Sequence, residues 1–152
     1  MNKFKIVITL FCVLFAFACA TTPSYRKART PTGVGYYDTL LQQNMYEITF
    51  NGSSSLSATT AQDYALLRAA ETCLENGYQT FDIVKSEDKT KTDVASIPMN
   101  YGYYSSPLVF SETTPKIILI IKCSEKEDLT FIAEEIRTNL RKKYNLDKLS
   151  TK

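Results

Sequence analysis

The chain has 152 residues, of which 44% are hydrophobic, and its formal net charge is +2 at pH 7. This length and apolar content suit one globular domain and argue against a disordered chain. The chain contains no histidine, which excludes Ser-His-Asp and Cys-His catalysis and removes the commonest transition-metal ligand.

Residues 1–18 have the features of an export signal. Two lysines precede an apolar run over residues 6–18, which is shorter than the about 20 residues that span a bilayer. Small residues flank Cys19, as in the bacterial lipobox, whose cysteine is acylated and becomes the new amino terminus. We therefore expect lipidation at Cys19. The alternative is ordinary signal-peptidase cleavage at Ala18-Cys19-Ala20, which would release a soluble secreted periplasmic protein.

Lipidation also predicts a location. More than one acyl chain gives stable anchoring, and Ala20 after the cysteine favours, by analogy with enterobacterial sorting, the inner leaflet of the outer membrane, facing the periplasm. Loss of residues 1–18 removes two lysines and leaves 16 basic and 16 acidic residues. The mature chain is then neutral, which disfavours nucleic acid as a partner.

Residues 19–35 are rich in Pro, Gly, Thr and Ser and show no apolar periodicity, which predicts a flexible lipidated tether ahead of a single domain at 36–152. Arg26, Lys27 and Arg29 in this tether are either solvated or in contact with anionic headgroups next to the lipid.

The first half of the domain reads as strand, helix and strand. Residues 46–51 alternate apolar and polar side chains, as in a half-buried strand. Thr59 with Gln62 fits a capping box, with Thr60 as an alternative cap, for a helix that runs to about Asn76 and ends at Gly77. A second strand follows at 78–86. A strand-helix-strand crossover predicts that the two strands are parallel, adjacent or one place apart.

Residues 87–115 show no clear period and are predicted to be a long loop. Tyr101, Tyr103 and Tyr104 cluster within it. One hypothesis makes these tyrosines a stacking surface for sugars or partner side chains; the other has them cover the sheet or extend into an irregular hairpin.

Residues 116–123 are apolar on both faces, which predicts a central buried strand. We expect Ser124 to cap a second helix, with Glu127 completing a capping box and the apolar stripe at 129–140 facing the core. Basic residues 141–143 then lie at the carboxyl end of that helix, where the helix dipole favours cations. The predicted fold is α+β: a small two-layer domain in the order β-α-β-(long loop)-β-α, with two helices packed on one face of a three-stranded mixed sheet.

Cys73 and Cys123 are the two cysteines outside the signal and the lipidation site. Cys73 lies on the apolar arc of the first predicted helix, and Cys123 alternates with apolar residues of the last strand. An oxidising compartment favours a disulfide between them, but a pair of buried free thiols would occupy the same positions.

A resemblance to a known family adds to these patterns. Gly35-Tyr-Tyr-Asp38, Tyr46-Glu-Ile-Thr-Phe50-Asn-Gly52, the helix segment Asp63-Tyr-Ala-Leu-Leu-Arg-Ala-Ala-Glu71 and Glu75-Asn-Gly-Tyr78 resemble small proteobacterial lipoproteins first catalogued as hypothetical proteins in Caulobacter. The resemblance covers about residues 35–85. It implies a lipidated envelope location and no activity, because the members of that family are uncharacterised.

Together these features predict a non-catalytic lipoprotein of the bacterial cell envelope. No phosphate-binding loop, paired carboxylates or metal-ligand cluster stands out, so we expect neither catalytic residues nor a metal or other cofactor. The expected partners are the membrane, through lipid on Cys19, and an envelope protein or peptidoglycan. The alternative function is a thiol-based redox sensor or enzyme that uses Cys73 and Cys123.

Overall fold

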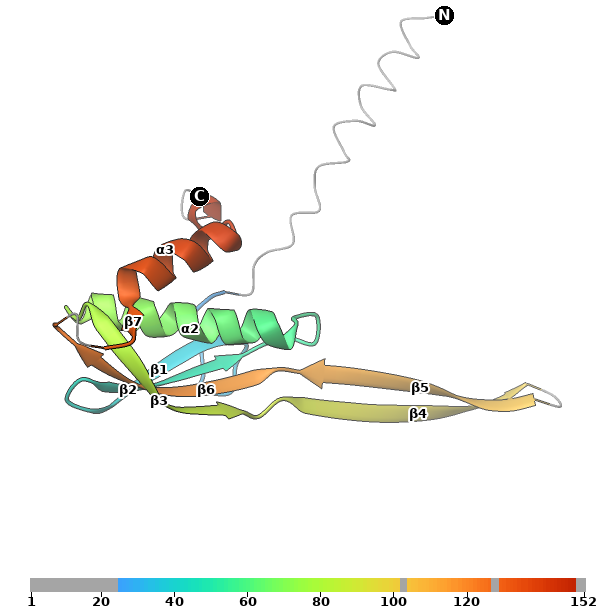
Figure 1. Ribbon diagram of the computed structural model, residues 1–152. Helices are drawn as coiled ribbons and strands as arrows, with labels where there is room; N and C mark the ends of the chain where they lie inside the picture. The colour runs from blue at the N-terminus through green and yellow to red at the C-terminus, as the bar shows by residue number, and fades with distance from the viewer. Residues whose placement is uncertain (1–24, 102–103, 127–128, 150–152) are drawn as a thin grey trace, which may run out of the picture.

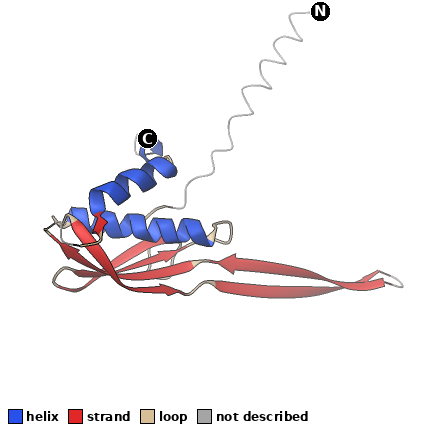
Figure 2. Ribbon diagram, viewed as in Figure 1, coloured by secondary structure: helices blue, strands red, loops and turns tan. Residues whose placement is uncertain are grey.

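The computed structural model describes residues 25–101, 104–126 and 129–149, which form an α+β fold (Figures 1 and 2). Its elements are β1 (Gly35–Gln42), β2 (Met45–Asn51), α2 (Ala58–Glu75), β3 (Thr80–Asp88), β4 (Lys91–Tyr101), β5 (Tyr104–Thr114), β6 (Lys116–Ser124), β7 (Phe131–Ile132), α3 (Ala133–Lys143) and the 3-10 helix η1 (Leu146–Leu149). The α+β class with two α-helices is confirmed for these residues. The predicted three-stranded sheet is wrong, because the main sheet has five strands in the order β1-β2-β6-β3-β7.

Strand β6 lies at the centre of this sheet, as its two apolar faces predicted. It pairs antiparallel with β2 on one side and with β3 on the other. Strands β2 and β3 are therefore parallel to each other and one place apart, which confirms that expectation. The prediction of a mixed sheet is wrong, since every hydrogen-bonded pair of strands is antiparallel. The reason is that β6 occupies the place between the two parallel strands.

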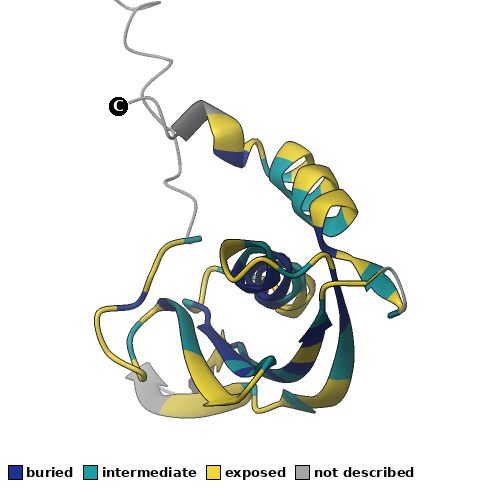
Figure 3. Cartoon of the chain, turned by 90° about the vertical axis from the view of Figure 1, so that its left-hand side faces the viewer, coloured by how far each residue is buried: buried dark blue, intermediate teal, exposed yellow. Residues whose placement is uncertain are grey.

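Helix α2 covers one face of the sheet and forms the core with it (Figure 3). Its start differs from the prediction: Ser57 is the N-cap, and its side-chain oxygen accepts a hydrogen bond from the Thr60 amide at 3.1 Å. Its end is as predicted, since Gly77 follows with φ +84°. The largest side chains that are fully buried here come from α2 and the three central strands: Phe50, Phe81, Ile48, Leu67 and Ile121.

The second predicted helix begins later than expected. Ser124 is the last residue of β6 and does not cap a helix; α3 starts at Ala133, and the predicted first-turn residue Glu127 lies outside the described residues. Short strand β7 precedes α3 and pairs with β3, where Phe131 stacks on Phe81 with ring centroids 5.3 Å apart. These contacts hold residues 131 and 132 extended. Helix α3 packs mainly on α2 rather than on the sheet, so the helices form two successive layers (Figure 1).

Most of the predicted loop at 87–115 is a regular β-hairpin. Strands β4 and β5 pair along their whole length, from Lys91↔Thr114 to Tyr101↔Tyr104, and project beyond the sheet and the end of α2 (Figure 1). The pairing of β4 with β5 continues the pairing of β3 with β6 without a shift in register, from Asp88↔Ile117 to Lys91↔Thr114. The hairpin therefore extends the two central strands outward by eleven residues each, about 35 Å at 3.2–3.4 Å per residue. We call β4–β5 the arm.

The domain also begins earlier than residue 36. Within the predicted tether, the Ala28 amide donates to the Tyr36 carbonyl and the Tyr36 amide donates to the Arg26 carbonyl, both at 2.8 Å. Ala28 is buried, and Gly35 has φ +125° at a point where a Cβ would collide with the Arg26 carbonyl. The described part of the tether, residues 25–35, is thus part of the folded domain, which corrects the predicted boundary.

Candidate functional site

The two cysteines form a disulfide in the core. Cys73 on α2 and Cys123 on β6 are bonded, with their Cα atoms 5.9 Å apart, and both residues are fully buried. The helical spacing of α2 and the alternation of β6 direct both residues to the same helix-sheet interface. The bond therefore ties the helix layer to the central strand. A buried disulfide offers no access to a substrate or partner thiol, so this geometry does not favour the redox alternative.

Arg68 is the centre of a charge cluster that sequence patterns did not reveal. It lies on the polar side of α2, yet its side chain is only 7% exposed. Its guanidinium donates two hydrogen bonds to the Glu75 carboxylate, at 2.8 and 2.9 Å, and one to Asp38 of β1 at 3.0 Å. The same guanidinium stacks over the ring of Tyr36, 4.7 Å from its centre.

These contacts set the charge state of Arg68. Burial alone would lower the pKa of its guanidinium, but the hydrogen bonds to Glu75 and Asp38 outweigh burial and hold the pKa above its ordinary value. A buried cation with paired carboxylates fastens β1 to α2, and removal of one partner leaves an uncompensated charge.

Glu71, one turn along α2, connects three parts of the chain. It accepts a hydrogen bond from the Tyr25 hydroxyl and one from the Arg141 guanidinium of α3, the latter at 2.8 Å. Burial, followed by the charge of Glu71, raises the pKa of Tyr25 well above its ordinary value. A second link joins the helices, because Asp63 accepts hydrogen bonds from Lys143 and Tyr144 at 2.6 and 2.5 Å.

A polar groove lies along this cluster, lined by Tyr36, Arg68, Glu71, Leu74, Glu75, Arg137 and Arg141. The charged side chains of this lining pair with one another or with the neighbouring carboxylates of Asp38, Glu134 and Asp147. In residues 25–101, 104–126 and 129–149 no three Cys, Asp or Glu side chains are grouped as a metal site. The side chains that line the groove thus join the N-terminal segment, α2 and α3. Most of their hydrogen-bonding groups are used in these contacts.

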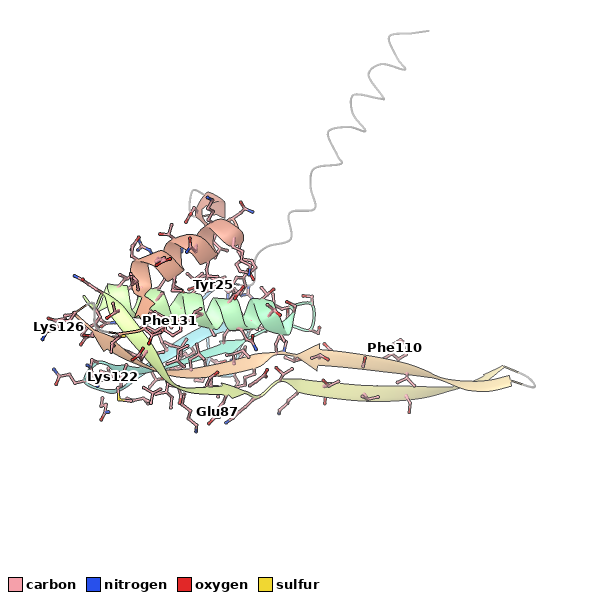
Figure 4. The ribbon with its side chains drawn as sticks, in the orientation of Figure 1. Tyr25, Glu87, Phe110, Lys122, Lys126 and Phe131 are labelled. Carbon is pink, nitrogen blue, oxygen red and sulfur yellow. A yellow bond between two sulfur atoms is a disulfide. The ribbon has the colours of Figure 1, made fainter. Side chains whose placement is uncertain are left out.

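The arm presents the most unusual surface of the molecule. Residues 94–111 include no Asp, Glu, Lys or Arg. Val94, Val109 and Phe110 are 66%, 62% and 54% exposed, and Phe110 lies on the arm beyond the end of α2 (Figure 4). Register places positions 95, 97, 99 and 101 on one face with their partners 110, 108, 106 and 104. That face, which includes Phe110, has the sequence pattern of a core strand although no third strand or helix adjoins it in the described residues; Val94 and Val109 lie on the opposite face.

The predicted tyrosine cluster maps to the far end of the arm. Positions 101 and 104 pair there, on the more apolar face, and Tyr103 lies outside the described residues. The structure therefore brings two of the three positions together at the point most distant from the core (Figure 1). Cys19, the predicted lipidation site, also lies outside the described residues.

The edges of the arm are poorly suited to the addition of a partner strand. Pro98 and Pro107 are directly opposite each other. The Lys89 amide donates to the Lys116 carbonyl, so these two residues form a hydrogen-bonded pair, and the same register continues along the arm. Hydrogen-bonded and non-hydrogen-bonded pairs alternate in an antiparallel ribbon, which makes positions 98 and 107 a non-hydrogen-bonded pair whose backbone groups point away from each other, toward the outer edges. Proline has no amide hydrogen, and each outer edge lacks a donor there. Closer to the core, Glu87 pairs with Lys85 and Lys89, and these charges protect the open edge of β3.

No helix in the described residues is both long and apolar enough to cross a bilayer. Comparisons with protein-family models, with curated proteins and with solved structures find no match to this chain.

Proposed function

We propose that this chain is a non-catalytic lipoprotein of the bacterial cell envelope, which binds another envelope protein through the arm. The observation that carries the proposal is the uncharged stretch of the arm, residues 94–111, which projects from a disulfide-bonded core. A two-stranded hairpin by itself is marginally stable in water, and exposed contiguous apolar surface marks interaction sites. A partner surface that covers the apolar side chains of the arm would satisfy both conditions.

The chemistry of the arm favours a protein over peptidoglycan. Peptidoglycan presents sugars and carboxylates, which are recognised by charged and hydrogen-bonding side chains. Residues 94–111 contain no cation to pair with a carboxylate, whereas Val94, Val109 and Phe110 fit an apolar protein surface. The Pro98 and Pro107 pair disfavours edge addition, so contact through the face of the arm is the expected mode.

The membrane location rests on sequence. The export signal and Cys19 support lipidation, and Ala20 supports the outer membrane with the domain in the periplasm. The resemblance of residues 35–85 to small proteobacterial lipoproteins points to the same location and remains a prediction, since no family model matches. Fatty-acid labelling in cells should mark the wild type and not Cys19→Ser; label retained without Cys19 would remove the lipoprotein proposal.

Site-specific photocrosslinking tests the arm. A photoreactive phenylalanine analogue at Phe110 or Val94 should give one adduct of discrete mass in intact cells. The same analogue at Leu40, which is 62% exposed on β1, is the control and should not. Equal adducts at all three positions, or none at the arm, would contradict the proposal.

Variants then test which part of the arm carries the contact. Val109→Ser with Phe110→Ser should abolish the adduct formed at Val94, because the apolar area available to the partner falls. Replacing Tyr101, Tyr103 and Tyr104 by Ala asks whether the tip takes part. If both sets of substitutions leave the adduct unchanged, the arm is adjacent to the partner without binding it.

A further inference from the structure

Three cations lie together on the N-terminal segment without carboxylate partners. Arg26, Lys27 and Arg29 are exposed, and within the described part of the chain no Asp or Glu is within ion-pair distance of any of them. They border a shallow recess together with Gly33 and Val34. Other clustered cations, such as Arg68 and Arg141, are neutralised by adjacent carboxylates. The N-terminal group is thus a local positive patch on a mature chain with zero formal charge.

The patch is held in place by the domain. Lys27 forms a β-bridge with Tyr36, and the two hydrogen bonds between residues 26–28 and Tyr36 fix the backbone on either side. Asn51 donates from its side-chain amide to the carbonyls of Pro31 and Gly33 at 3.0 and 3.1 Å, which fixes the following turn. Because the backbone is ordered, little backbone conformational entropy is lost when these side chains meet a charged surface.

The patch is close in sequence to the proposed anchor. Arg26 is seven positions after Cys19, and an extended chain spans at most about 3.6 Å per residue, or roughly 25 Å over this distance. An acylated Cys19 lies at the level of the lipid headgroups. The tether is therefore short enough to keep the patch near the bilayer and long enough to let it touch the headgroups.

We infer that Arg26, Lys27 and Arg29 form a docking surface for anionic phospholipid headgroups, which orients the domain on the membrane that its lipid occupies. The inference rests on the proposed function, because only a lipid at Cys19 brings this surface to a bilayer in the cell. Charge complementarity selects the occupant: the patch carries three positive charges, and no acidic side chain of residues 25–101, 104–126 and 129–149 forms an ion pair with them. Basic residues near an anionic membrane each contribute roughly a fivefold increase in affinity, so three amount to on the order of 100-fold.

A semisynthetic anchor tests the inference independently of lipidation in the cell. The chain from Cys19 to Lys152 retains every described element, and its cysteines 73 and 123 are bonded and buried, so a maleimide that carries one myristoyl chain will attach at Cys19. One such chain gives weak, reversible binding to neutral vesicles. Vesicles of phosphatidylcholine alone should bind this conjugate weakly, and vesicles with half phosphatidylglycerol on the order of 100-fold more tightly.

The matched variants have equal net charge. Arg26→Gln, Lys27→Gln and Arg29→Gln together should remove the preference for phosphatidylglycerol, and added salt should do the same to the wild type. The control replaces exposed Lys91, Lys122 and Lys126 by Gln and should keep the preference. Equal loss in both variants, or no preference in the wild type, would overturn the inference. Failure of fatty-acid labelling at Cys19 in cells would instead overturn the proposed function.

Discussion

Loss of the Cys73–Cys123 bond should lower the free energy of unfolding by about 4 kcal/mol. The bond closes a loop with a sequence separation of 50 residues. In the chain-entropy account, cross-linking over a loop of this length restricts the unfolded chain by about 14 cal/mol/K, or about 4 kcal/mol at 25 °C. This is a large fraction of the 5–15 kcal/mol that stabilises a typical domain.

Urea unfolding of the oxidised and the reduced protein measures this difference with the side chains unchanged. Because both cysteines are fully buried, the protein must be unfolded before reduction and then refolded under reducing conditions. The reduced form should unfold at lower urea concentration and with a larger m-value, since its unfolded chain is less compact. The Cys73→Ala, Cys123→Ala variant is the control, and reductant should not change its stability.

The chain-entropy reasoning would be refuted by a difference below about 1 kcal/mol between oxidised and reduced wild type. It would also be refuted if reductant destabilised the control variant to the same extent, because the effect would then arise elsewhere. Thiol titration of the denatured protein before reduction should find neither Cys73 nor Cys123 free.

Four further substitutions test other parts of the fold by urea unfolding. Gly52→Ala should lower the free energy of unfolding by about 1–3 kcal/mol, because the added Cβ would lie 2.5 Å from the Pro115 ring. Gly77→Ala meets no atom within 4 Å and should cost about 1 kcal/mol because of its positive φ. Equal costs of the two substitutions would contradict the close approach at Gly52. Arg68→Ala should cost about 2 kcal/mol, because it removes the hydrogen bonds that join β1 to α2 and leaves the partly buried carboxylate of Asp38 unpaired, and a loss below about 1 kcal/mol would mean that the cluster contributes little. Tyr25 has a raised pKa in the folded state, so its contribution is complete below about pH 10, the unfolded value, and is lost as pH rises further. Tyr25→Phe should therefore unfold with a shallower loss of stability above pH 10, and an unchanged slope would contradict the assigned burial.

The parts of the fold that local sequence determines were predicted well. Strand β2 and the end of α2 at Gly77 depend on alternation and on a residue that adopts positive φ, and both occur as expected. The apolar run of β6 indicated a central strand, and the parallel relation of β2 and β3 followed from crossover handedness. The order of elements along the chain could not show that a later strand, β6, lies between β2 and β3 and pairs with both.

The start of α3 shows how tertiary contacts override local signals. Ser124 followed by an acidic residue three positions later is a normal helix start in sequence. In the structure, Thr80 donates to the Lys126 carbonyl and the Thr130 amide donates to the Asp82 carboxylate, so the chain after β6 is held by β3. Such partners lie some 46 to 48 residues away in sequence, beyond any local pattern.

Arg68 and the arm were missed for different reasons. The helical position of Arg68 predicts exposure, and its burial depends on Asp38 of β1, a strand that the weakly patterned N-terminal residues did not reveal. The arm lacks the clean alternation of a half-buried strand because prolines interrupt it and apolar residues occur on both faces. Its regular pairing follows from the register of β3 and β6, which is a property of the assembled sheet.

The distribution of charge along the β3–β6 ribbon is the strongest argument that the arm is a binding surface. Next to the core the open edge carries Lys85, Glu87 and Lys89, which is how exposed edges are commonly protected from association. Strand β2 ends at Asn51, and the amide of the next residue, Gly52, donates to the Pro115 carbonyl, so beyond this point no further described strand adjoins the ribbon on that side. If solubility alone determined the sequence, we would expect more charged residues in the arm, where no other strand or helix of the described residues packs on the ribbon. Residues 94–111 instead carry none, and exposed apolar side chains lie on both faces, with Val94 and Val109 on one and Phe110 on the other, which is the pattern expected of a surface that is covered when the protein is at work.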